Sequence, residues 1–243
     1  MNSDKIWLVT GASRGIGLAV AERVLAAGDR VAILARGAEI EDIASRLGES
    51  CMACRADITS RDQIDEAVAQ IVSRWGRIDV VVNNAGAHRG GKLQRLSQED
   101  WQTVIDTNLT GALNVITATS EQLTTGGAIV NIGAVVGFRG FPGDAAYAAS
   151  KAGIAGLTRA LAIELAPRGI TVNLVIPGLV LTEMTGALSE KALESMRKKI
   201  PLGRFGEPDE IAEVVEWTAR ARYMTGAFVP ADGGLMSSFG VLG

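Results

Sequence analysis

The sequence contains few of the side chains that form disulfides or metal sites. Among its 243 residues there are two cysteines, Cys51 and Cys54, and one histidine, His88. The cysteines form a single C-x-x-C pair and lack the second pair that a zinc site of this type needs. Their segment is typical of a short buried strand, where this spacing places the two thiols on opposite faces. We therefore expect two small buried side chains and no bound metal.

Blocks of like charge and long hydrophobic runs are also missing. The formal net charge is −3 and no stretch is rich in Lys or Arg, which disfavours nucleic acid and anionic membranes as partners. No apolar run is long enough to span a bilayer. The first residues lack the basic and apolar segments of a secretory signal peptide. These absences predict a cytoplasmic protein that binds neither nucleic acid nor membrane.

What the chain does contain is an alternation of Val- and Ile-rich runs with longer segments of helical period. Such alternation is typical of βα units and a parallel sheet. The expected strands are Ile6–Val9, Val31–Ala35, Cys51–Arg55, Val80–Asn83, Ala128–Ile132, Thr171–Val175 and Ala227–Pro230. The expected helices are Gly15–Ala27, Glu39–Leu47, Arg61–Trp75, Gln98–Leu123, Ala145–Ala166, Glu190–Lys199 and Pro208–Arg220. We predict a single-domain α/β Rossmann fold over residues 1–243, with a seven-stranded parallel sheet and helices on both faces.

Two segments of this arrangement are candidates for ligand binding. Thr10–Gly17 follows the first strand and opens the first helix. Glycines there let the backbone turn sharply and approach a pyrophosphate, while the helix N-terminus offers free N–H groups to that anion. Residues 178–205 leave the sixth strand at its carboxyl end, where ligands of open parallel sheets bind, and they form a candidate substrate lid.

Several motifs occur in a fixed order along nearly the whole chain. They are the glycine segment with the spacing G-x-x-x-G-x-G, Asp57, Asn83–Gly86, Asn108 in an N-x-x-G, Tyr147 with Lys151, Pro177–Gly178, Pro201–Pro208 and Asp232–Gly234. Taken together, this order resembles the short-chain dehydrogenases/reductases. The resemblance implies a Rossmann enzyme that transfers a hydride between a nicotinamide cofactor and a carbonyl or alcohol.

The end of the second strand indicates which nicotinamide cofactor to expect. NAD sites place a carboxylate there for the ribose 2′-hydroxyl, but this strand ends in Ala35-Arg36-Gly37. A guanidinium can pair with the 2′-phosphate of NADP(H), and by resemblance Arg14 flanks the same group. The alternative is that Arg14 and Arg36 are two solvated surface arginines.

The resemblance also implies a set of cofactor contacts. Asp57 would hold the adenine, and Asn84–Gly86 would pass beside the ribose. The full expected set is Gly11, Ser13, Arg14, Gly15, Ile16, Gly17, Arg36, Asp57, Ile58, Asn84, Ala85, Gly86, Tyr147, Lys151, Pro177, Gly178, Val180 and Thr182.

The expected catalytic group centres on Tyr147 and Lys151. They lie four residues apart in a helical segment, so both side chains project from one face. A nearby ammonium stabilises a phenolate and lowers the pKa of a tyrosine. By resemblance Tyr147 is the acid/base, Lys151 tunes it and binds the nicotinamide ribose, and Asn108 holds a water of the proton relay. We expect His88, in a glycine-rich loop, to be a solvated residue at the substrate mouth.

One position departs from the family pattern. The family uses a serine about 13 residues before the tyrosine to bind the substrate oxygen, and this chain has Ala134 there. Loss of one such donor costs on the order of 100- to 1000-fold in rate, about 3–4 kcal/mol. The chain is either an engineered Ser→Ala variant or a natural member with weakened or altered chemistry.

Within the family, the glycine segment and Pro201–Pro208 look most like the 3-oxoacyl-acyl-carrier-protein and acetoacetyl-CoA reductases. This implies reduction of a 3-oxoacyl thioester or small ketone, with acyl carrier protein as a candidate partner. Leu123–Gly127 carries no Lys or Arg, and Arg168 alone is expected as a basic residue near the outer edge of the site. The family packs the helices of segments 98–123 and 145–166 across two-fold axes, so the resemblance, with the apolar residues of these segments, implies a homotetramer. The alternative to an enzyme is a non-catalytic NADP-binding sensor or scaffold.

Overall fold

The computed structural model describes residues 4–181 and 190–238, and its centre is one parallel sheet. The strands lie in the order β3-β2-β1-β4-β5-β6-β7, and every neighbouring pair is parallel. Their bounds are β1 Ile6–Thr10, β2 Arg30–Ala35, β3 Cys51–Arg55, β4 Ile78–Asn83, β5 Leu123–Ile132, β6 Thr171–Pro177 and β7 Phe228–Ala231. This confirms the predicted seven-stranded parallel α/β fold.

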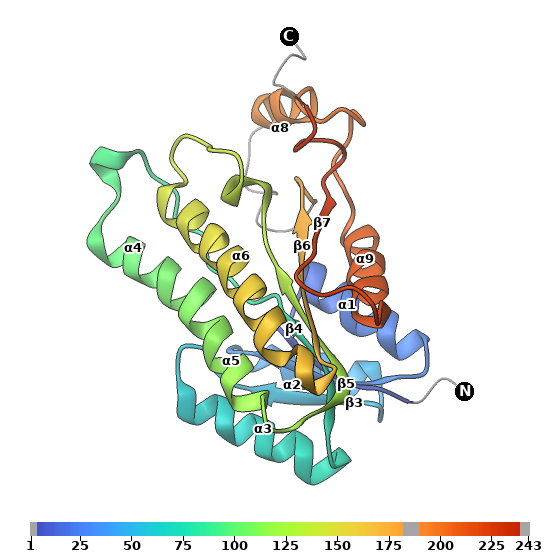
Figure 1. Ribbon diagram of the computed structural model, residues 1–243. Coiled ribbons are helices and arrows are strands. Elements are labelled where there is room, and N and C mark those ends of the chain that lie inside the picture. The colour runs from blue at the N-terminus through green and yellow to red at the C-terminus, as the bar shows by residue number, and fades with distance from the viewer. Residues whose placement is uncertain (1–3, 182–189, 239–243) are drawn as a thin grey trace.

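Helices cover both faces of the sheet (Figure 1). One face carries α1 (Gly15–Ala26), α2 (Glu39–Leu47) and α9 (Pro208–Arg220). The other carries α3 (Arg61–Trp75), α5 (Gly111–Thr119) and α6 (Ala145–Leu165). The described residues also form α4 (Gln98–Ile105), α8 (Glu190–Arg197), a π-helical turn at Asp106–Thr110 and short 3₁₀ turns at Leu93–Arg95, Val135–Gly137 and Ala166–Arg168.

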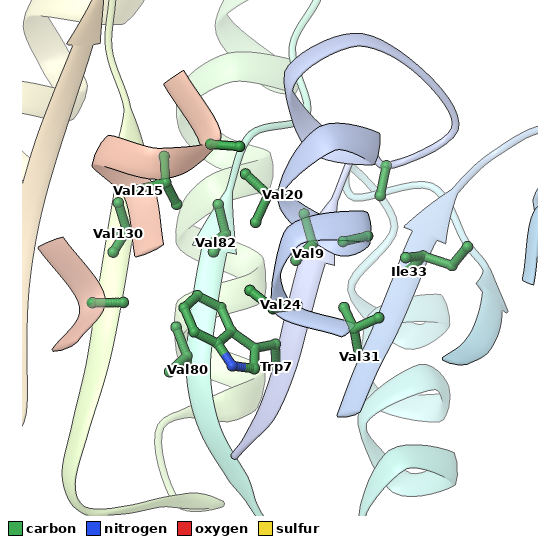
Figure 2. Packing of buried hydrophobic residues seen from close by; sticks show 14 of the residues in the cluster. Trp7, Val9, Val20, Val24, Val31, Ile33, Val80, Val82, Val130 and Val215 are labelled. Carbon is green, nitrogen blue, oxygen red and sulfur yellow. The ribbon is translucent and has the colours of Figure 1, made fainter. Parts of the chain in front are cut away.

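The two hydrophobic layers follow from the alternation of side chains along each strand. In β1, Trp7 and Val9 pack against the α1 and α9 side, where Figure 2 shows them among valines of β2, β4 and β5. Ile6 and Leu8 point to the opposite layer. Because both faces are covered, all five residues of β1 are buried, as expected for a central parallel strand.

The two cysteines occupy these two layers, as predicted. Cys51 belongs to the layer with Trp7, and Cys54 to the layer with Leu8, and both are free thiols. Burial raises the pKa of Cys51 to about 11 and that of Cys54 to about 12, so both stay protonated at neutral pH. Among the residues that the structure describes, no group of three or more His, Cys, Asp or Glu could hold a metal ion.

The predicted helix Gln98–Leu123 is confirmed as one helical segment, but its end is wrong and it contains a π turn that was not predicted. It consists of α4, a π-helical turn at Asp106–Thr110 and α5, and it stops at Thr119. Leu123 instead begins β5 by pairing with Ile78, where the register between the two strands shifts. The π turn was not predicted because such turns are rare and occur as single turns inside α-helices.

None of the helices within the described ranges is long and apolar enough to cross a membrane.

The order in which strands are added to the sheet reverses between β1 and β4: β2 and β3 lie on one side of β1, and β4 to β7 lie on the other. The crevice outside the carboxyl ends of these two strands is where open α/β sheets bind ligands. The glycine segment, Asn84–Gly86 and Ala134 all follow strands at this edge.

Candidate active site

A polar joint connects the loops that leave β1 and β4. Thr10 Oγ1 accepts hydrogen bonds from the backbone N–H groups of Asn84 and Ala85, each at 3.1 Å. The side-chain amide of Asn84 donates to the carbonyls of Thr10 and Gly11, both at 3.0 Å. The two loops are therefore held together at the point where their strands diverge.

The glycines of the first loop allow a close approach. Gly11 and Gly15 have φ of +64° and +57°, a region that favours glycine. A Cβ on Gly11 would lie 2.7 Å from Ala85 Cα, and one on Gly17 would lie 2.5 Å from Asn84 Nδ2. Ser13, Arg14 and Ile16 lie between these glycines, where α1 begins at Gly15. A turn that only glycine fits, opening into a helix N-terminus, suits a pyrophosphate.

At the end of β2, Arg36 extends its guanidinium into solvent with 74% of its side chain exposed, and Nη1 lies 3.6 Å from Asp57 Oδ2. The Asp57 carboxylate also accepts from the Thr59 N–H and hydroxyl, at 2.9 and 2.8 Å. Partial burial alone would raise the pKa of Asp57, but these bonds and the Arg36 charge lower it. Asp57 is therefore a carboxylate at neutral pH, with Arg36 beside it. Arg14 is exposed at the start of α1.

Asn108 lies in the π turn and is buried against two other elements. Its Oδ1 accepts from the Ala87 N–H at 2.7 Å, and its Nδ2 donates to the Ala87 carbonyl and to Ser150 Oγ, both at 3.0 Å. Ser150 Oγ in turn donates to the Tyr147 carbonyl at 2.8 Å. A chain of hydrogen bonds thus runs from the loop after β4 through Asn108 to the turn of α6 that carries Tyr147.

Tyr147 and Lys151 share one face of α6, as the spacing predicts. Lys151 Nζ lies 5.6 Å from the centre of the Tyr147 ring and donates to the Ile132 carbonyl at 2.8 Å. Burial lowers the pKa of Lys151 to about 8. Burial, and secondly the charge of Asp144, raise the pKa of Tyr147 to about 12. At neutral pH the site holds a protonated phenol and a mostly charged ammonium.

Ala134 lies two residues beyond the carbonyl that Lys151 contacts, at the carboxyl end of β5. Its backbone is extended, with φ of −163° and ψ of 152°, and it precedes the 3₁₀ turn Val135–Gly137. Ala134 is partly buried and presents a methyl group where the family pattern has a hydroxyl.

The residues expected beyond β6 are only partly described. Pro177 ends β6, and Gly178 N–H donates to the Ala231 carbonyl at 3.0 Å. A Cβ on Gly178 would lie 2.6 Å from Asp232 Cα, so the motifs Pro177–Gly178 and Asp232–Gly234 meet here. Val180 is buried in the layer with Trp7. Thr182 lies outside the described residues, as does part of the candidate lid 178–205.

Two predicted placements are wrong. His88 is not a solvated loop residue: its side chain is two-thirds buried, its Nε2 lies 2.9 Å from Asp144 Oδ1, and its ring contacts Tyr147. Arg168 does not border the site. Its guanidinium donates to the Ser120 and Leu123 carbonyls, at 2.7 and 2.9 Å, near the amino end of β5. Sequence spacing cannot predict where these two side chains lie, because the contacts of His88 and of Arg168 join segments far apart in the chain.

Thr10, Ser150 and the Ile132 carbonyl contribute to the site without having been predicted. Thr10 lay inside the glycine segment, and Ser150 lay between Tyr147 and Lys151. Ser150 stands three residues after Tyr147, so helical spacing already placed its hydroxyl on the same face. No sequence signal identifies a backbone carbonyl as the acceptor for Lys151.

Comparison with known proteins agrees with this geometry. A family model described as enoyl-(acyl carrier protein) reductase matches residues 11–236. The 3-oxoacyl-[acyl-carrier-protein] reductase of Staphylococcus aureus is 42% identical over 97% of this chain and 99% of its own length. The enzyme of that name from Thermotoga maritima is 43% identical over 96% of this chain and 98% of its own.

Solved structures give the same result. A short-chain dehydrogenase/reductase of Serratia marcescens is 35% identical, with a TM-score of 0.90 over 96% of this chain and 98% of that chain. A blue fluorescent protein from a metagenomic library, solved in complex with NADPH, is 35% identical, with a TM-score of 0.90 over 95% and 97%. The chain belongs to the short-chain dehydrogenase/reductase family and is an oxidoreductase. Its curated relatives named above are 3-oxoacyl-[acyl-carrier-protein] reductases.

The polar joint predicts a test of stability. Thr10→Val keeps the shape of the side chain but leaves the partly buried Asn84 and Ala85 N–H groups without their acceptor, which costs about 1–3 kcal/mol. Urea unfolding followed by circular dichroism should show this loss for Thr10→Val and a smaller loss for Thr10→Ser, which retains the hydroxyl. Equal losses for the two variants would show that the hydroxyl does not hold the loops.

Proposed function

We propose that this chain reduces a 3-oxoacyl thioester, or a similar small ketone, to the secondary alcohol with NADPH. The observation that carries the proposal is the convergence of Asn108, Tyr147 and Lys151 at one edge of the sheet, joined through Ser150. The names of the curated relatives support the substrate class. The NADPH complex of a structural neighbour supports the cofactor.

The residues present fit a dinucleotide. Gly11 and Gly17 leave no room for a Cβ beside Asn84 and Ala85, Asp57 is ionised, and Arg36 supplies an exposed cation for a 2′-phosphate. Bound NADPH would supply the hydride that reaches the substrate carbonyl carbon. The protein's part is to orient the ketone and to give a proton to its oxygen.

Tyr147 is the proton donor in this proposal. With a pKa of about 12 it is protonated throughout the physiological range, and it is more acidic than the alcohol that forms when the alkoxide takes up its proton. The charge of Lys151 stabilises the phenolate that remains. A water held beside Asn108 would then return the proton by way of Lys151. The Lys151 ammonium predominates below a pH of about 8, so its help fades as the pH rises through that value.

A second candidate function is a non-catalytic NADP-binding sensor or scaffold. The observation that favours it is Ala134, whose methyl group cannot bind the oxygen of a ketone. Asn108, Tyr147 and Lys151 favour the enzyme, because a binding module needs no proton donor beside a lysine. Both origins of Ala134, an engineered change and a natural difference, are consistent with either candidate.

The carrier of the acyl group is a further part of the proposal. The relatives' names support acyl carrier protein, and acetoacetyl-CoA offers the same thioester on a smaller carrier. We also propose that residues 178–205 cover the substrate. The C-terminal end of this segment is fixed to the residues after β7, since Leu202 N–H donates to the Gly233 carbonyl at 3.1 Å.

Cofactor preference follows from Arg36. NADPH should bind more tightly than NADH, and Arg36→Asp should erase or reverse the difference, because a carboxylate repels the 2′-phosphate. Fluorescence titration of both cofactors measures this. Arg46→Asp, the same charge change on the exposed side of α2, should leave the preference intact. Equal dissociation constants for NADPH and NADH in the unmodified chain would contradict the assignment.

Ala134→Ser tests the catalytic proposal. A restored hydroxyl acts mainly in the transition state, so NADPH oxidation should become about 100- to 1000-fold faster while the NADPH dissociation constant barely moves. Tyr147→Phe in that background should abolish the gain. The assay uses acetoacetyl-CoA, a 3-oxoacyl carrier-protein thioester, an enoyl thioester and free ketones. No gain with any of them would favour the non-catalytic binder.

We also propose that the chain forms a homotetramer. Leu113 on α5 and Ile163 on α6 are 44% and 78% exposed, which leaves apolar side chains on the outward faces of these helices. Light scattering should give a mass near four chains, and Ile163→Glu should lower it. A stable mass near 25.4 kDa for the unmodified chain would refute this assembly.

A further inference from the structure

The one histidine of the chain is paired beside the phenol of Tyr147. His88, in the loop after β4, places Nε2 2.9 Å from Oδ1 of Asp144, the residue that precedes α6. The His88 and Tyr147 ring centres are 5.1 Å apart with their planes at 85°, an edge-to-face contact. The titratable imidazole of His88 therefore packs against the ring of Tyr147, the proposed proton donor.

Backbone contacts hold the two loops of this pair together. Gly91 N–H donates to the Gly143 carbonyl at 2.8 Å, and Gly143 has φ of +95°. A Cβ on Gly90 would lie 3.1 Å from His88 Cε1, so the loop passes closely over the imidazole. The backbone of the two loops and the hydrogen bond to Asp144 therefore hold the His88 imidazole in place.

The charged groups around the pair come from both elements that form it. The hydrogen bond from Asp144 raises the pKa of His88, burial opposes this, the charge of Asp144 adds to it, and Arg89 on the same loop lowers it. Burial, and secondly the charge of Asp144 just before α6, raise the pKa of Tyr147, and Lys151 Nζ on α6 lies 5.6 Å from the ring centre. With His88 protonated the pair is neutral, and with His88 neutral it leaves one negative charge beside the phenol.

We propose that the His88–Asp144 pair is a positioning element of the active site, which orients the Tyr147 ring and, in its protonated form, cancels the Asp144 charge beside the phenol. The proposal rests on the proposed role of Tyr147 as proton donor. As Tyr147 gives up its proton, negative charge develops on the phenol, and an uncompensated Asp144 opposes it. Reduction is therefore faster while His88 carries its proton.

The direction of the pH effect follows. Because the pKa of His88 is raised above its ordinary value, the protonated pair persists to higher pH than for a free histidine and is lost as the pH rises through that pKa. Lys151 titrates near pH 8 and produces its own decline. A comparison between variants is needed to separate the two effects.

The first experiment needs no catalysis. The chain, without a polyhistidine tag, contains one histidine, so proton NMR titration reports His88 alone. Asp144→Asn should lower the His88 pKa by roughly one unit. With Tyr223→Phe only Tyr147 remains of the two tyrosines, and its phenolate absorbance should appear at lower pH once Asp144 is also replaced. Asp62→Asn, on the exposed side of α3, is the matched control and should change neither value.

The second experiment measures the pH profile of NADPH oxidation in the Ala134→Ser background with and without His88→Gln. Glutamine retains a donor for Asp144 but cannot carry the proton. The rate with His88 divided by the rate with His88→Gln should be up to about tenfold at low pH. As the pH rises, this ratio should fall to a constant value, and the fall should follow the NMR titration curve of His88. The Lys151 decline cancels in this ratio.

The possible failures are distinguishable. A ratio that is independent of pH, or a His88 pKa unmoved in Asp144→Asn, overturns the role of the pair even if Tyr147 proves to be the donor. If no variant reduces any substrate, the proposed function fails. The phenolate titration then decides the inference, because an unchanged Tyr147 pKa in Asp144→Asn would overturn it.

Discussion

The site depends on how the polar groups are satisfied where β1 and β4 diverge. Parallel strands that separate leave N–H and carbonyl groups without partners, and buried groups of that kind are costly. Thr10 and Asn84 supply the missing partners from their side chains. The same bonds hold the glycine loop so close to Ala85 that a Cβ on Gly11 would not fit between them. The shape of the crevice therefore depends on these hydrogen bonds.

From this joint a second set of hydrogen bonds reaches the chemistry. Asn108 binds both backbone groups of Ala87 and then Ser150, which binds the Tyr147 carbonyl. The π turn that carries Asn108 widens the helix at that point, within the continuous helical segment expected from the apolar period.

Much of this arrangement could be predicted from the sequence, for identifiable reasons. The predicted strand Ile6–Val9 and the Tyr147–Lys151 pair depend on local period, and the opposite faces of Cys51 and Cys54 depend on a spacing of three. His88 and Arg168 could not be placed, since their partners, Asp144 and the carbonyls of Ser120 and Leu123, lie 56, 48 and 45 residues away. Local pattern carries no information about contacts of that range.

The difference between binding and catalysis in this fold is clearest at Ala134. The dinucleotide crevice is made largely of backbone, glycine and helix terminus, so it tolerates few changes without losing its shape. Ala134 has an extended backbone that any residue adopts, and its side chain is only partly buried. The Ala134 side chain lies beyond the end of β5, and the hydrogen bonds of Asn108 and Ser150 do not involve it. A methyl group at this position therefore alters the chemistry available to a ketone while leaving the fold and the crevice free of any compensating change.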